Sequence, residues 1–278
     1  MSHYESPYRD SYFREGAAGQ AYDEGISNPF ELTIFDLEKK YLHQIYSTWL
    51  SGKANPAYLD YAAGTGRILA LFRDRTTLKF AVDTCPAQLE SARSKVPDAT
   101  FIVDDIVTNP ACLPIRFDLI TCFRLFVNLE KANRLPILQA LANLLNDDGI
   151  LVVDNHMNRY SILGLIALFM RKCLGYKDKS LAHPGGRTIA GTMSENEMRQ
   201  LLKDAGFVIR RTYRFMVLPG YKDYRPLPSH LLVRVEQLLA MMPGLNLMGK
   251  NQIFVCQTAR DKSSEELGRQ GQVDILDR

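Results

Sequence analysis

The sequence predicts an α/β protein with a doubly wound, mostly parallel seven-stranded sheet, helices on both faces and a helical arm at the N-terminus. Short apolar runs alternate with segments of helical periodicity. Each run is nearly continuous, which is typical of parallel strands buried on both faces. The composition, 46% hydrophobic and 23% charged over 278 residues, is that of a globular protein and excludes collagen, coiled coil and overall disorder.

The first 50 residues precede the predicted sheet. Residues 1–25 are rich in Tyr, Gly and charge, and we expect an irregular arm there. From Pro29 to Leu50 apolar side chains recur with a roughly helical period, and Asn28 before a proline is a typical helix start. The expected units are an arm with a cap helix (1–50), a main domain (51–260) with an insertion at about 157–192, and a loose polar tail (261–278).

Strands and helices then alternate along the main domain. The run YLDYAAGTG at 58–66 predicts a first strand that enters a tight turn at its glycines. Further strands are expected at 79–83, 100–106, 117–123, 150–156, 208–218 and 251–259. Helices are expected at 67–75, 85–96, 131–149, 194–207 and 230–242, the third of them ended by Gly149.

The turn after the first strand is the strongest signal of a binding site. Gly64 and Gly66 let the backbone approach a ligand, and a following helix would direct free N–H groups to the same place. In open α/β sheets, ligands bind outside the carboxyl ends of the strands. Asp83 ends the second strand, where an acid can accept hydrogen bonds from two ribose hydroxyls.

Two cofactor classes compete for this turn. A dinucleotide fold requires G-x-G-x-x-G, and Leu69 stands where the third glycine would be, so that pattern fails. The block LDYAAGTGRI instead resembles the first motif of the class I S-adenosylmethionine (SAM)-dependent methyltransferases, L-D-x-G-x-G-x-G, with Ala62 in place of the first glycine. The resemblance continues in order to about residue 260, through the segments at Asp104–Ile106, 117–129, 149–153 and 204–207.

The resemblance implies a role for each matching residue. Asp60, Ala62, Gly64 and Gly66 would border the amino-acid end of SAM, and Asp83 would hold its ribose. Asp105, favoured over Asp104, would meet the adenine amino group, with Ile106 packed on the ring. Phe123 and Arg124 would lie toward the sulfonium, and Tyr22 would belong to an N-terminal cap over the cofactor.

The methyl acceptor is expected at the same edge of the sheet. Transfer from a sulfonium needs an aligned nucleophile and the exclusion of water. His156 directly follows the fifth strand and is the candidate general base, with a structural histidine as the alternative. Nothing resembles a divalent-metal cluster, so no metal is expected. The Asn-Pro-Pro-Tyr motif of enzymes that methylate DNA bases is absent, so a nucleic-acid acceptor is not expected.

The charge of the chain is unevenly distributed. Residues 159–250 contain fifteen Lys and Arg against six Asp and Glu, a local net charge of +9, while the remainder carries −6. Arg210, Arg211 and Arg214 cluster in this basic region, and an apolar run lies at 162–170. An anionic acceptor, or an amphiphilic one presented at a membrane surface with peripheral contact, is therefore a hypothesis.

The resemblance thus implies a SAM-dependent methyltransferase that acts on a small molecule, with oxygen as the expected accepting atom. Five scattered cysteines and the polar N-terminus indicate a cytoplasmic protein. A non-catalytic SAM-binding scaffold of the same fold is the first alternative, supported by Ala62. An NAD-dependent oxidoreductase is the second. The acceptor and the oligomeric state are not predicted.

Overall fold

A computed structural model describes residues 23, 27–162, 164–166, 169, 173, 192–218, 228–242 and 244–259. Its seven strands are β1 (Tyr58–Tyr61), β2 (Lys79–Asp83), β3 (Thr100–Val103), β4 (Phe117–Cys122), β5 (Leu145–Asn155), β6 (Phe207–Phe215) and β7 (Asn251–Thr258). The longer helices are α3 (Pro29–Trp49), α4 (Pro86–Lys95), α5 (Lys131–Asn143), α7 (Glu195–Asp204) and α8 (Ser229–Met241).

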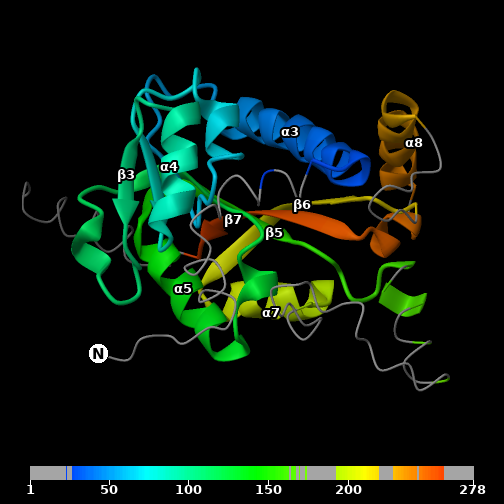
Figure 1. The fold of residues 1–278 in the computed structure, drawn as a ribbon. Helices are drawn as coiled ribbons and strands as arrows, with labels where there is room; N and C mark the ends of the chain where they lie inside the picture. The colour runs from blue at the N-terminus through cyan, green and yellow to red at the C-terminus, as the bar shows by residue number, and fades with distance from the viewer. Residues whose placement is uncertain are drawn as a thin grey trace, which may run out of the picture.

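The strands form one sheet in the order β3-β2-β1-β4-β5-β7-β6 (Figure 1). β1 to β5 are parallel to their neighbours, while β7 pairs antiparallel with both β5 and β6. The predicted α/β class, the seven strands and their mostly parallel arrangement are confirmed. The order reverses between β1 and β4, so their carboxyl ends border the crevice where α/β sheets bind ligands.

Helices cover both faces of the sheet. The core on one face joins the sheet to α3 and α4, and α8 contacts α3 and β6. The core on the other face joins it to α5 and α7. Figure 1 shows α3 and α4 on one side of the strands and α5 and α7 on the other.

Helix α3 begins where the sequence predicts. The Asn28 side chain accepts a hydrogen bond from the Glu31 N–H at 3.0 Å, and Pro29 occupies the first helical position, where its missing N–H leaves no bond unmade. Apolar residues at helical spacing, among them Ile34, Leu37 and Leu42, are fully buried against the sheet. The helix thus places its N-terminal half over the edge of the sheet where α/β proteins bind ligands.

The helix predicted at 67–75 is wrong in type and length. Only a short 3-10 helix, η1 (Leu69–Phe72), forms there. Leu69 and Phe72 are three residues apart and both buried, and a 3-10 turn aligns residues at that spacing on one side. The burial of this pair therefore favours a short 3-10 helix here over an amphipathic α-helix.

The helix predicted to end at Gly149 ends at Asn143 instead. Leu145 is already paired with Phe117 in the sheet, so β5 starts four residues before Gly149. A Cβ at Gly149 would lie 2.7 Å from the Phe117 carbonyl oxygen. The glycine is required by the close approach of two strands, and it does not terminate a helix.

Several sequence-based expectations lie outside the described residues. These are Tyr22, most of the insertion at 157–192 and the tail 261–278. In the part of the chain that is described, no helix is long and apolar enough to cross a bilayer.

Candidate active site

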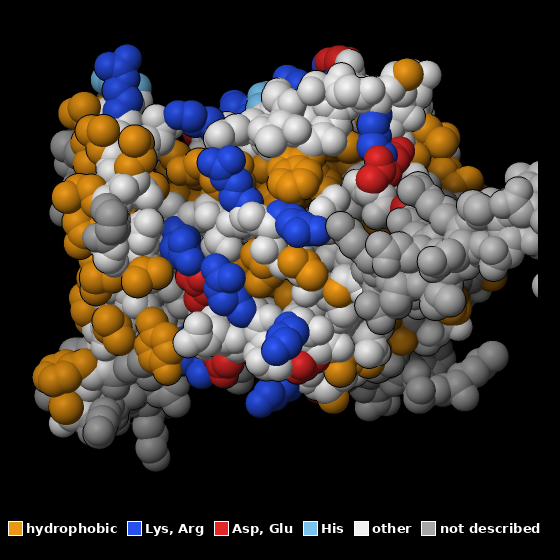
Figure 2. Space-filling model, turned by 180° about the vertical axis from the view of Figure 1, so that it is seen from behind, with side chains coloured by type: hydrophobic (Ala, Val, Ile, Leu, Met, Phe, Trp, Pro, Cys, Tyr) orange, Lys and Arg blue, Asp and Glu red, His pale blue; other side chains and the backbone are white. Residues whose placement is uncertain are grey.

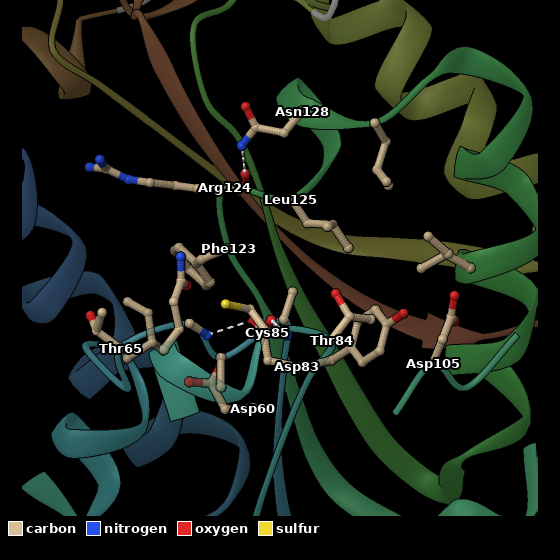
Figure 3. A pocket seen from close by; sticks show the side chains of 18 of the residues that line it. Asp60, Thr65, Asp83, Thr84, Cys85, Asp105, Phe123, Arg124, Leu125 and Asn128 are labelled. Atoms are coloured by element: carbon tan, nitrogen blue, oxygen red, sulfur yellow. Dashed lines mark hydrogen bonds between the residues drawn. The ribbon is translucent and has the colours of Figure 1, made fainter. Parts of the chain in front are cut away.

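A pocket of about 190 Å³ opens at the carboxyl edge of β1, β2 and β4 (Figure 3). Its walls come from the glycine turn after β1, the turn after β2, the loop after β3 and the segment after β4. Eight of the predicted residues line it: Asp60, Ala62, Gly64, Asp83, Asp105, Phe123, Arg124 and the weighed alternative Asp104. Four chain segments that are distant in sequence therefore meet at one cavity.

The turn after β1 has a left-handed backbone at alternate residues. Ala62, Gly64 and Gly66 have φ values of 56°, 53° and 74°. Ala62 thus keeps the conformation that a glycine would adopt more easily at this position. The departure from the family motif is accommodated in the backbone, and the turn forms.

Asp60 lies in β1 just before this turn and is hydrogen-bonded to the segments that surround it. Its buried carboxylate accepts hydrogen bonds from the Leu69 N–H at 2.9 Å and from the Thr121 hydroxyl at 2.7 Å. Burial raises the pKa of Asp60 to about 7, because the two hydrogen bonds only partly compensate the lost hydration. Asp60 therefore connects β1, β4 and η1 at the base of the pocket.

The two glycines have different surroundings. A Cβ at Gly64 would meet only the end of the flexible Gln88 side chain, at 2.8 Å. A Cβ at Gly66 would lie 2.7 Å from the Ala92 Cβ and 3.0 Å from its Cα, within α4. Gly64 borders the pocket, whereas Gly66 lies behind it and allows the turn to pack on α4.

Asp83 ends β2 and is paired with Val103 at the end of β3. One carboxylate oxygen accepts the Gly64 N–H at 2.8 Å and the other accepts the Cys85 N–H at 2.9 Å. Figure 3 shows the Asp83 side chain between these two turns. Each carboxylate oxygen can accept a further hydrogen bond, so the group remains able to receive ligand hydroxyls while it holds both turns.

The loop after β3 presents Asp104 and Asp105 to the pocket. The Asp104 oxygens accept from the Asp105 N–H and from the Asn109 side chain, whereas Asp105 uses one oxygen for the Val107 N–H. Asp105 therefore keeps more capacity for a ligand. Ile106 is buried in the core and does not line the pocket; Val107 lines it instead.

The segment after β4 turns sharply at Arg124. Its φ of 57° is left-handed, its N–H donates to Asp154 at 2.7 Å, and its carbonyl accepts from the Asn128 side chain at 2.7 Å. The guanidinium lies 2.8 Å from a carboxylate oxygen of Glu31 on α3. Arg124 thus borders the pocket through its backbone and joins α3 through its side chain.

A buried charged cluster separates the pocket from α3. Glu38 is almost fully buried and pairs with Arg67, and Arg124 lies 3.9 Å away. Burial, and then the Glu38 charge, raise the pKa of Asp154 to about 7. Burial lowers the pKa of Lys250, whose ammonium lies 4.6 Å from the Phe30 ring centre, to about 8. Opposite charges are therefore concentrated between the pocket and α3.

A latch at the N-terminal side was not predicted. Asp23 accepts hydrogen bonds from the Thr65 hydroxyl at 2.7 Å and from Lys95 at 2.6 Å, and Lys95 also donates to the Thr65 carbonyl at 2.9 Å. Thr65 belongs to the glycine turn and lines the pocket. Asp23 directly follows Tyr22, the residue expected in a cap over the cofactor, and this adjacency is the sequence signal that could have indicated the latch.

Two other groups of predicted residues lie away from the pocket. His156 directly follows β5, is partly buried and is not among the residues that line the pocket. Arg210, Arg211 and Arg214 do not converge: they contact Gln257, the Tyr213 ring and Glu195, respectively. Within the described residues, no group of three or more His, Cys, Asp or Glu is placed to hold a metal ion.

Comparison with known proteins agrees with this geometry. A family model described as a methyltransferase domain matches residues 59–149, the segment that supplies most of the pocket. No curated protein matches the chain. Many solved structures do match it, several of them described as methyltransferases.

Three of these structures show how far the likeness extends. The magnesium protoporphyrin IX methyltransferase of Synechocystis PCC 6803, solved with bound S-adenosylhomocysteine, has a TM-score of 0.56 and 16% identity over 89% of this chain and 96% of its own. A SAM-dependent methyltransferase from Clostridium acetobutylicum has a TM-score of 0.53 and 14% identity over 81% and 92%. Mitomycin 7-O-methyltransferase has a TM-score of 0.55 and 14% identity over 91% and 60%.

These identities show a common fold, and the family model covers the segment that builds the pocket. The residues of the pocket also fit the cofactor, since the left-handed turn and the carboxylates of Asp83 and Asp105 present the groups that a nucleoside with a charged amino-acid end requires. Residues 59–149 match a methyltransferase domain, and the chain as a whole has the fold of SAM-dependent methyltransferases.

Proposed function

We propose that this enzyme methylates an oxygen of a small molecule that is anionic or amphiphilic. The observation that carries the proposal is the junction at Arg124, where the cofactor pocket meets the charged cluster under α3. The similar solved structures include one named as a 7-O-methyltransferase, which favours oxygen as the accepting atom. The five free cysteines suit a cytoplasmic enzyme.

The cofactor is proposed to lie along the pocket with its ribose at Asp83 and its adenine at Asp105. The turn at Ala62–Gly64 would border its amino-acid end, and Phe123 would border its sulfur. When bound, SAM supplies an electrophilic methyl group. The protein contributes alignment, because Asp60 holds β1, β4 and η1 together and so keeps these contacts in place.

The acceptor is proposed to approach from the α3 side of the same edge. Arg124 and Lys250 provide positive charge there, and Glu31 and Glu38 orient the guanidinium. An acceptor with a carboxylate or phosphate would compete with Glu31 for Arg124. His156, at the end of β5, is proposed as the base that removes a hydroxyl proton.

Calorimetry with SAM tests the cofactor site. We expect Asp83→Ala to weaken SAM binding at least about tenfold, since it removes charge-assisted hydrogen bonds to the ribose and to two turns. Asp74→Ala, at an exposed residue outside the pocket, is the control and should bind as the unaltered protein does. Equal affinities for both variants would show that the ribose is placed wrongly.

Mass spectrometry of candidate metabolites incubated with isotopically labelled SAM tests the reaction. With an acceptor in hand, His156→Asn should lower kcat by about a hundredfold and leave SAM affinity unchanged, the usual magnitude for loss of a general base. An unchanged kcat and pH profile would assign His156 a structural role. Tight SAM binding without methylation of any compound would favour the scaffold alternative.

A further inference from the structure

Large apolar side chains are exposed along one margin of the molecule. Fourteen such residues are exposed in the described part of the chain, and ten of them lie on three segments: α8 with the residue that follows it, η5 (Leu245–Met248) and 160–169. They are Tyr160, Leu165, Ile166, Phe169, Leu231, Leu238, Met241, Met242, Leu245 and Leu247. We call this surface the α8–η5 margin. Isolated exposed apolar residues need no explanation, but such a concentration indicates an interaction surface.

Helix α8 turns its apolar face outward because of how it is anchored. Leu232 and Glu236 are buried, and the Glu236 carboxylate accepts the N–H groups of Val217 at 2.7 Å and Leu218 at 2.8 Å. The charged side chain therefore faces inward, where it caps the end of β6. Leu238 and Met241 remain 65% and 78% exposed. The outer side of α8 therefore carries large apolar side chains, which the usual surface helix keeps on its inner face.

The three segments adjoin one another, because Asn158 joins the start of 160–169 to η5 and η5 contacts α8. Its side-chain amide donates to the carbonyls of Leu247 at 3.4 Å and Gly249 at 3.1 Å, and its N–H donates to the Lys250 carbonyl at 2.6 Å. Tyr160 and the residues that follow therefore start beside η5, which itself contacts α8.

The charge next to this margin is positive. Arg234 and His230 are the exposed ionisable residues on α8, and its one acid, Glu236, is turned inward. Figure 2 shows the apolar side chains along the edge that α8 occupies and Lys and Arg side chains across the adjoining face. The wider segment 159–250 carries a net charge of +9.

We propose that the α8–η5 margin docks onto an anionic lipid surface. A bilayer accommodates both features, since apolar side chains enter the acyl boundary while cations meet anionic headgroups. A second copy of the chain fits less well, because a symmetric contact would bring positively charged surfaces together. Docking would place the acceptor region at the membrane. The placement of the acceptor region at the membrane rests on the proposed function, whereas lipid binding by the margin does not.

Co-sedimentation with phosphatidylcholine vesicles, with and without phosphatidylserine, tests the proposal. The full chain should bind phosphatidylserine vesicles better, and binding should fall with added salt. The double variant Leu238→Gln/Met241→Gln should reduce the partition coefficient roughly tenfold or more, because it removes apolar groups from the contact. Arg234→Gln should weaken binding to vesicles that contain phosphatidylserine and leave binding to pure phosphatidylcholine vesicles unchanged.

The matched control is Leu78→Gln/Val208→Gln, which alters two exposed apolar residues outside the margin and should bind vesicles like the unaltered chain. SAM calorimetry on every variant, compared with the unaltered chain, checks the fold. If the unaltered chain itself fails to bind SAM or to methylate, the proposed function is overturned while the vesicle result stands. Absent vesicle binding, or equal binding by both double variants, would overturn the proposal. Light scattering that shows a dimer dissociated by Leu238→Gln/Met241→Gln would also overturn it, in favour of a second copy.

Discussion

Single residues in the glycine turn carry different constraints, although the motif presents them as equivalent. Ala62 and Gly64 border the pocket, while Gly66 faces α4. All three have positive φ, so a side chain at either glycine is strained by the backbone alone. Only at Gly66 does a neighbouring helix also block it.

Gly66→Ala is therefore expected to lower the free energy of unfolding by about 3 kcal/mol, the sum of overpacking against Ala92 and a left-handed alanine. Gly64→Ala should cost only about 1–2 kcal/mol, because the end of the Gln88 side chain can move away. Urea unfolding of both variants measures the difference. Equal losses would mean that α4 yields at Gly66.

Asp154 shows how burial alters ionisation at the same edge. Its folded pKa of about 7 lies above the unfolded value near 4, so the unfolded chain releases this proton first as pH rises. The stabilisation that the protonated Asp154 provides to the folded state is therefore lost between about pH 4 and 7, and it stays lost above that range.

Asp154→Asn should remove this loss, since the amide oxygen can still accept the Arg124 N–H. Relative to the unaltered protein, the variant should gain on the order of 2–4 kcal/mol between pH 4 and 7. Denaturant unfolding at several pH values measures it, with Asp74→Asn, at an exposed acid, as the control. A stability difference independent of pH would contradict the raised pKa.

Among the larger elements, α3 and α4 connect the pocket to the rest of the chain. α3 supplies Glu31 and Glu38 to the charged cluster beside the pocket. α4 supplies Lys95, which joins Asp23 to the glycine turn. Residues before the sheet therefore take part in a site that the sheet positions.

Asp23→Ala should weaken SAM binding about fivefold, because Thr65 and Lys95 lose their common acceptor and the turn is less constrained. Isothermal calorimetry measures the affinity. Asp36→Ala removes an exposed pair with Lys39 on α3 and should leave the affinity unchanged. If the two variants bind SAM equally well, the latch does not support the turn.

The molecule as a whole separates two kinds of surface. One end of the sheet carries the pocket, and the margin at α8 carries exposed apolar residues beside positive charge. The modest net charge of +3 is the sum of an acidic part and a basic part. Because the pocket and the margin are separate, a ligand bound in the pocket should raise the stability of the whole fold without any change at the margin.

SAM at a hundred times its Kd should raise the Tm by about 5–10 °C, because binding to the folded state alone adds about 2.7 kcal/mol to the free energy of unfolding. NADH at the same concentration should produce no shift. Differential scanning fluorimetry with both ligands measures this. A larger shift with NADH would restore the oxidoreductase alternative.

The sheet, its alternation with helices and the place of the pocket follow from residue order. Buried strands need continuous apolar runs, and the turn after β1 needs residues that tolerate positive φ. These are local requirements, so they are visible in a single sequence. For the same reason Asn28-Pro29 correctly marks the start of α3.

Partners across the chain are decided only in the folded molecule. Gly149 faces a carbonyl 32 residues earlier, Gly66 faces α4, and the arginines of β6 contact Gln257, Tyr213 and Glu195 instead of one another. The outward face of α8 likewise depends on Glu236 capping the end of β6. Residue order specifies which chemical groups exist and which local conformations they prefer. Close packing between distant segments determines which of those groups meet.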